Sequence, residues 1–73
     1  MHQLTISTDH TVTVTHHHDH ASAHGHLMRH VVTADCYLHT LAAEPDRTAY
    51  ELVAVAEGRR PRRAGRAVIE EQT

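Results

Sequence analysis

The apolar residues of this chain change from a strand-like to a helical spacing close to Asp19, and that change limits the folds that are open to it. Residues 2–16 are rich in Thr, Val and Ile, and Leu4, Ile6, Val12 and Val14 share one parity. β-Branched residues at a period of two indicate strands with one buried face. Thr8-Asp9-His10 is polar, so we expect a hairpin whose three- or five-residue loop pairs Ile6 with Val12. One long strand is the alternative.

From His20 to Ala34 the spacing becomes helical, with Asp19 placed to cap the first free N–H groups. At about 100° per residue, one broad stripe holds the apolar side chains. Its members are Ala21, Leu27, Met28, Val31 and Ala34. An amphipathic helix of this kind typically covers a sheet.

Three further strands are expected after the helix, at residues 37–43, 48–56 and 65–71. Glu44-Pro45-Asp46-Arg47 has the composition of a turn. The segment 48–56 is the most apolar and is expected at the centre of the sheet. Pairing Ala43 with Thr48 places Tyr37, His39 and Leu41 on the face of Tyr50 and Leu52, and Leu38 on the other face.

These elements predict one α+β domain over residues 1–73, of order ββαβββ, with one amphipathic helix packed on a mostly antiparallel sheet. A chain of 73 residues without Trp or Phe has a thin core and gains from an oligomer or a metal ion. Both faces of the sheet carry apolar residues, so a homodimer is one expectation.

The single cysteine, Cys36, allows no intramolecular disulfide, which suits a reducing compartment such as the cytoplasm. The sequence has no membrane-length apolar run and no signal-peptide pattern, so no membrane partner is expected. It sets out no nucleophile–base pair, phosphate loop or nucleotide fingerprint, and we expect no enzyme. A lone structural cysteine is commoner than a reactive one.

Histidine is unusually abundant, with ten in the chain and seven between His16 and His30. Full protonation of the ten would change the formal charge from −2 to +8. Zinc, nickel and copper(II) accept neutral imidazole, and helical residues four apart lie side by side. The pairs His20/His24 and His26/His30 have this spacing, and His16 shares the parity of Val14. The predicted metal ligands are therefore His16, His20, His24, His26 and His30.

The spacing alone also arises by chance in so dense a run of histidines. His18 and Asp19 are further choices for a third ligand, and half-buried neutral histidines beside a solvated loop are the structural alternative. The chain has no HExxH, CxxC or zinc-finger signature. Cys36 and His39 are three residues apart, a spacing that places them on opposite faces of a strand.

Charge is segregated as well. Residues 1–57 hold two Arg and seven acids, a charge of −5, whereas residues 58–66 hold five Arg and no acid. Arginine contacts phosphate bidentately, so this stretch is a candidate site for nucleic acid or an acidic partner. The residues of that site are Arg59, Arg60, Arg62, Arg63 and Arg66. A solubilising hairpin loop is the alternative, and a dimer without either ligand is the third hypothesis.

The segments TADCYLH, TAYELVAVAE and RRPRRAGRAVIE, between Val31 and Ile69, resemble small uncharacterised proteins of actinobacteria and their phages. The resemblance covers most of the chain and implies the same ββαβββ order. It implies no activity, and the dense histidines at 16–30 look like a departure from such proteins. A phage or host accessory role is what it adds to the alternatives.

Overall fold

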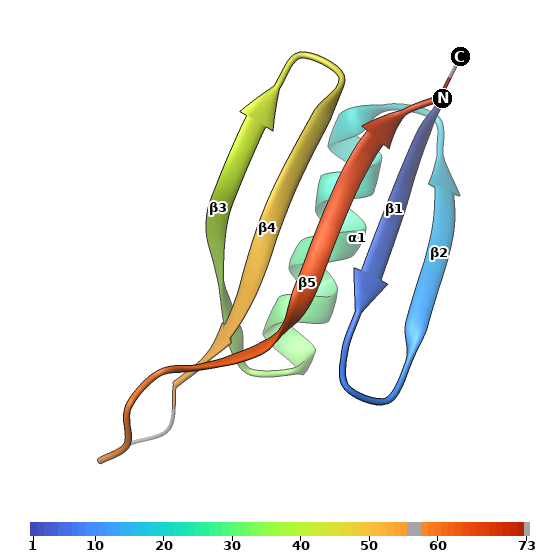
Figure 1. Ribbon diagram of the computed structural model, residues 1–73. Coiled ribbons are helices and arrows are strands. Elements are labelled where there is room, and N and C mark those ends of the chain that lie inside the picture. Colours follow the sequence, from blue (N-terminus) through green and yellow to red (C-terminus); the bar gives the residue numbers. More distant parts are fainter. Residues whose placement is uncertain (56–57, 73) are drawn as a thin grey trace.

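The computed structural model describes residues 1–55 and 58–72 and confirms the ββαβββ order (Figure 1). Its elements are β1 (His2–Ser7), β2 (Val12–His17), α1 (His20–Thr33), β3 (Cys36–Glu44), β4 (Arg47–Ala54) and β5 (Arg62–Glu71). The predicted strand 48–56 is β4, and the end predicted for it at Ala56 lies outside the described residues.

The five strands form one antiparallel sheet in the order β2-β1-β5-β4-β3. The central strand is therefore β5 and not the segment 48–56, because β5 inserts between β1 and β4. This insertion brings the two ends of the chain together, and the Gln72 N–H donates to the Met1 carbonyl at 2.7 Å (Figure 1).

Helix α1 begins where the sequence predicts, because the Asp19 carboxylate accepts the Ser22 N–H at 2.7 Å. It ends at Thr33, where Ala34 N–H donates to the His30 carbonyl and Asp35 takes a left-handed φ of 56°. The buried stripe contains Leu27 and Val31, as predicted, and also Ala23, which was not predicted. Ala21, Met28 and Ala34 are exposed, because a single helix on a flat layer buries only the residues closest to the sheet.

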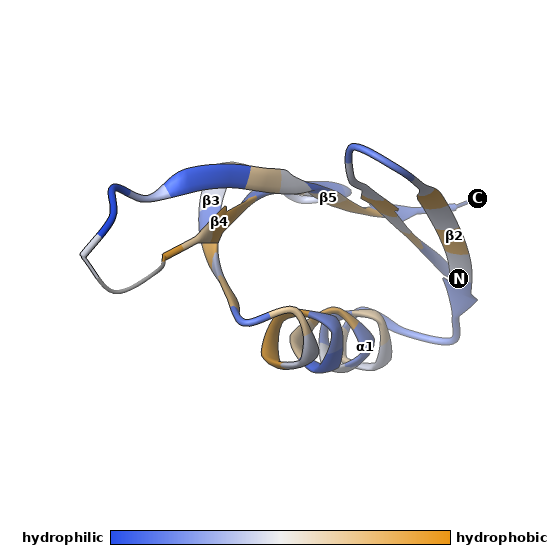
Figure 2. Ribbon diagram, turned by 90° about the horizontal axis from the view of Figure 1, so that it is seen from below, coloured by the Kyte–Doolittle hydropathy of each residue, from blue (hydrophilic) through white to orange (hydrophobic). Residues whose placement is uncertain are grey.

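The core lies between α1 and one face of the sheet, here called the inner face (Figure 2). The buried side chains that fill it are Leu4, Ile6, Ala23, Leu27, Val31, Tyr50, Leu52, Ala67 and Ile69. The opposite face is here called the outer face, and no helix of the described residues covers it (Figure 2).

The register of the first hairpin differs from the prediction. Its loop has four residues, Thr8–Thr11, and pairs Ile6 with Thr13 and Leu4 with Thr15. Thr8 fixes this loop, since its N–H donates to the Thr11 carbonyl at 2.8 Å and its hydroxyl accepts the Thr11 N–H at 3.2 Å. Val12 and Val14 therefore lie on the outer face and are 67% and 48% exposed.

The faces of β3 also differ from the prediction, because a register shift falls between Thr40 and Ala42. Ala43 pairs with Thr48 as expected, but Tyr37 pairs with Val53 and Leu38 pairs with Leu52. Leu38 thus packs against the core, and Tyr37 and His39 lie on the outer face. When one residue bulges out of a strand, every side chain beyond the bulge lies on the face opposite to the one that simple alternation predicts.

Candidate functional site

The first part of the candidate site is a ring pair on α1. His20 and His24 are one helical turn apart, and their imidazoles stack with centroids 6.2 Å apart and an interplanar angle of 19°. The Asp19 cap begins the helix at His20, so it also sets the position of both rings. The structure therefore brings together the pair that the sequence selected.

A third imidazole, which the sequence analysis missed, lies next to this pair. His2 begins β1, and its ring meets His20 edge-on with centroids 5.9 Å apart. Its Nδ1 atom is buried and has no hydrogen-bond partner among the described residues. The signal that could have found it is parity, because His2 alternates with Leu4 and Ile6 and so shares the inner face.

His24 connects the three rings to the core. Its centroid lies 6.4 Å from that of Tyr50, which is 7% exposed. Burial raises the pKa of the Tyr50 hydroxyl above its ordinary value of 10.0. The His24 ring, at the edge of the core, thus adjoins a region from which water is largely excluded.

His26 pairs with His17 of β2, at 5.2 Å between ring centroids. The Thr15 hydroxyl lies 2.8 Å from His17 Nε2, and the Ser22 hydroxyl lies 3.3 Å from Nδ1. Both nitrogens of His17 therefore have protein partners. His26 and His30, the second predicted pair, line a shallow depression with Arg29 and Thr33.

His16 does not join the other predicted ligands. It pairs with Gln3 and has the parity of Val12 and Val14, which the hairpin register places on the outer face. The predicted register places Val14, and with it His16, on the buried face, and the observed register reverses that placement for both residues. His17 occupies the inner position instead.

Across residues 1–55 and 58–72, no three His, Cys, Asp or Glu side chains converge as a ready-made metal site. The rings of His2, His20 and His24 form a chain with spacings of 5.9 and 6.2 Å. Two imidazoles that share one tetrahedral ion, at metal–nitrogen distances of about 2.0–2.1 Å, have centroids roughly 5 Å apart. Each spacing in the chain exceeds that value by about an ångström.

The arginine-rich stretch is a strand for much of its length and not the single loop expected for residues 58–66. β5 begins at Arg62, so Arg62, Arg63 and Arg66 have fixed places in the sheet. Arg63 Nε lies 3.4 Å from Glu51 Oε2, and Arg66 stands opposite Glu51 in the neighbouring strand. This end of the β4–β5 hairpin projects from the body of the molecule (Figure 1).

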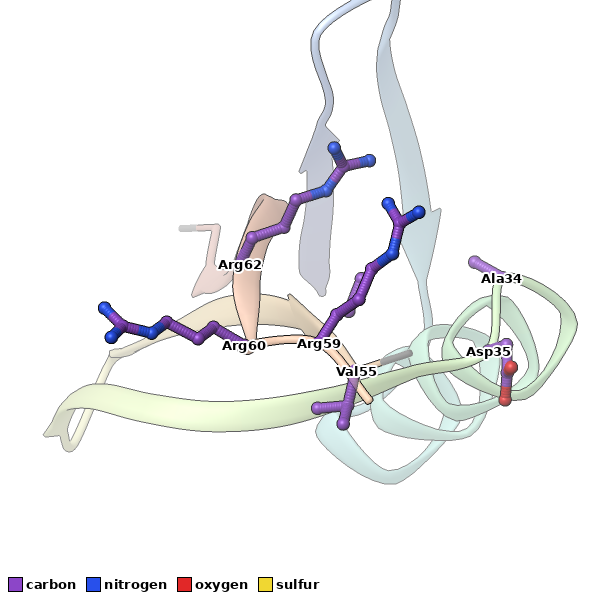
Figure 3. A pocket seen from close by; sticks show the side chains of 7 residues that line it. Ala34, Asp35, Val55, Arg59, Arg60 and Arg62 are labelled. Atoms are coloured by element: carbon purple, nitrogen blue, oxygen red, sulfur yellow. The ribbon is translucent and has the colours of Figure 1, made fainter. Parts of the chain in front are cut away.

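Three of these arginines line a cleft of about 330 Å³. Arg59 and Arg62 point in similar directions, whereas Arg60 points the other way (Figure 3). Asp35, at the end of α1, supplies one carboxylate, and Ala34, Ala54 and Val55 complete the lining. In the described part of the chain, Arg59, Arg60 and Arg62 form no ion pair.

The remaining candidate, Cys36, is a free cysteine whose thiol donates to the Ala34 carbonyl at 3.4 Å. Cys36 lies on the inner face and His39 on the outer face, as their spacing predicts. No described helix is long and apolar enough to cross a membrane. Comparison of the chain with family models, curated proteins and solved structures gave no match.

Proposed function

We propose that this protein is a small non-enzymatic module that binds a divalent transition metal ion through His2, His20 and His24. The observation that carries the proposal is the buried Nδ1 of His2, which has no hydrogen-bond partner among the described residues and lies beside the ring of His20. Leaving a buried polar atom unsatisfied costs about 1–3 kcal/mol, so a natural structure rarely keeps one without a use.

A metal ion satisfies this nitrogen where the neighbouring groups do not. Zinc, nickel and copper(II) all bind neutral imidazole. The rings of His2, His20 and His24, when neutral, each have one nitrogen with a lone pair that can bind the ion. His20 is exposed and His24 half-buried, so their side chains can rotate without repacking the core. Coordination of one ion by all three rings requires the two ring spacings to close by about an ångström and His24 to approach His2 as well, and it leaves the fourth position of a tetrahedral ion open.

Charge near the proposed ion decides how readily a cation enters. The N-terminus of α1 carries partial positive charge, which opposes a cation. Two carboxylates act against it. Asp19 caps the helix, and Glu71 stands directly across from His2 in β5. These two carboxylates therefore offset the partial positive charge of the helix N-terminus, which favours the approach of a cation.

The test is isothermal titration of the protein with zinc and nickel. The wild-type chain is expected to bind one equivalent, and His2→Ala, His20→Ala and His24→Ala are each expected to weaken binding by about tenfold or more. His16→Ala and His30→Ala are the controls, since both were predicted ligands and neither joins the three rings. Circular dichroism of every variant checks that the fold persists.

Two results would overturn the proposal. One is the absence of a saturable heat at any ratio of metal to protein. The other is equal loss of affinity in His2→Ala and His16→Ala, which would indicate weak, interchangeable binding by a histidine-rich surface.

A further inference from the structure

The outer face of the sheet presents an exposed aromatic ring, with two arginines two strands away, on the side opposite the rings of His2, His20 and His24. Tyr37 is 66% exposed there, on a face that no helix covers. It pairs with Val53, and Val53 pairs with Arg63, so the three residues form one row across β3, β4 and β5. Strands two apart are separated by roughly 10 Å, a distance that an arginine side chain spans in large part.

The charges around this row favour a polyanion. Arg66 lies in the adjacent row of the same face, and Arg60 lines the cleft with Arg59 and Arg62 but points the opposite way from them (Figure 3). The single carboxylate within the two rows, Glu51, is 3.4 Å from Arg63 Nε and holds that guanidinium in place. Four of the five arginines in residues 59–66 have no ion pair within the described residues.

We infer that this face binds single-stranded nucleic acid, with a base stacked on Tyr37 and phosphates on Arg63, Arg66 and the arginines of the hairpin end. An exposed aromatic ring on an open sheet, flanked by arginine, recognises the two parts of an unpaired nucleotide, its flat base and its phosphate. A duplex hides its base faces, so stacking on the ring adds affinity only for an unpaired strand.

The experiment measures fluorescence anisotropy of labelled 15-nucleotide dT and rU strands with the intact protein, over a series of salt concentrations. Tyr37→Ala is expected to weaken binding roughly tenfold, and Tyr37→Phe, which keeps the ring, should bind as wild type does. Replacing Arg59, Arg60, Arg62 and Arg63 with Ser should make the salt slope shallower by about 0.7 for each lost phosphate contact. Arg29→Ser with Arg47→Ser, which removes the two arginines outside residues 59–66, is the control for loss of positive charge elsewhere, with no change in slope expected.

Four comparisons decide the outcome. A stronger affinity for rU than for dT, or the reverse, distinguishes RNA from DNA and supports the inference in both cases. Equal affinity for a duplex of the same length, or for Tyr37→Ala and wild type, would overturn it in favour of general attraction to polyanions. Equal competition by polyglutamate would overturn it in favour of an acidic protein partner.

Discussion

At the residue scale, two glycines are in opposite environments and give a matched test of the packing. A Cβ atom at Gly65 would collide with the backbone carbonyl of Ser7, and it would also crowd Leu52 and Thr8 at 3.3 Å. A Cβ atom at Gly25, within α1, would meet nothing within 4 Å. The first glycine is required by the close approach of β1 to β5, and the second is not required by any contact.

Gly65→Ala is therefore expected to lower the free energy of unfolding by about 1–3 kcal/mol, the usual cost of overpacking. Gly25→Ala should raise it by up to about 1 kcal/mol, since alanine favours a helix more than glycine does. Urea unfolding followed by circular dichroism measures both. A Gly65→Ala protein as stable as wild type would contradict the placement of β5 beside β1.

Tyr50 provides a pH test at the same scale. Burial raises the pKa of its hydroxyl, so above pH 10.0 the unfolded chain loses this proton before the folded chain does. The free energy of unfolding is unaffected by Tyr50 below that pH and falls as the pH rises through the folded-state pKa. Tyr50→Phe should remove this part of the alkaline loss.

The direct measurement is the ultraviolet titration of Tyr37→Phe, in which Tyr50 is the only tyrosine. Its tyrosinate absorbance should rise at a higher pH in the folded protein than in denaturant. Identical titration curves in the two conditions would show that Tyr50 is not covered by α1.

At the element scale, the start of α1 depends on one hydrogen bond from the Ser22 N–H to Asp19. Asp19→Ala should lower the free energy of unfolding by about 1 kcal/mol. Asp19→Asn keeps an acceptor oxygen and should lose much less. Asp9→Ala, in the exposed hairpin loop, is the control in the same urea unfolding assay. Equal stability of Asp19→Ala and Asp9→Ala would contradict the cap.

The strands show where sequence patterns stop being informative. Alternation correctly placed Leu4 and Ile6 on a buried face, because β1 has a strand on each side and the helix beneath it. The same alternation failed for Val12 and Val14. β2 pairs only with β1, so little burial depends on its faces, and the Thr8 hydrogen bonds fix the register instead.

At the scale of the whole molecule, the element order followed from periodicity, but the order of strands in the sheet did not. The pairing of β1 with β5 joins residues near the two ends of the chain, and no local pattern encodes that contact. The candidate site likewise combines a local contact, which the sequence predicts, with a long-range contact, which it does not. His20 and His24 are neighbours through helix geometry alone, whereas His2 reaches them only because β1 and α1 pack together.

The most direct test of the metal proposal is a long-range proton–nitrogen NMR spectrum of the histidine rings, recorded while zinc is added. We expect the Nδ1 resonance of His2 to shift with the first equivalent, together with one ring nitrogen each of His20 and His24, and a chelator to reverse the change. Unchanged His2 nitrogens at saturating zinc, with shifts confined to rings such as those of His16 and His30, would contradict it.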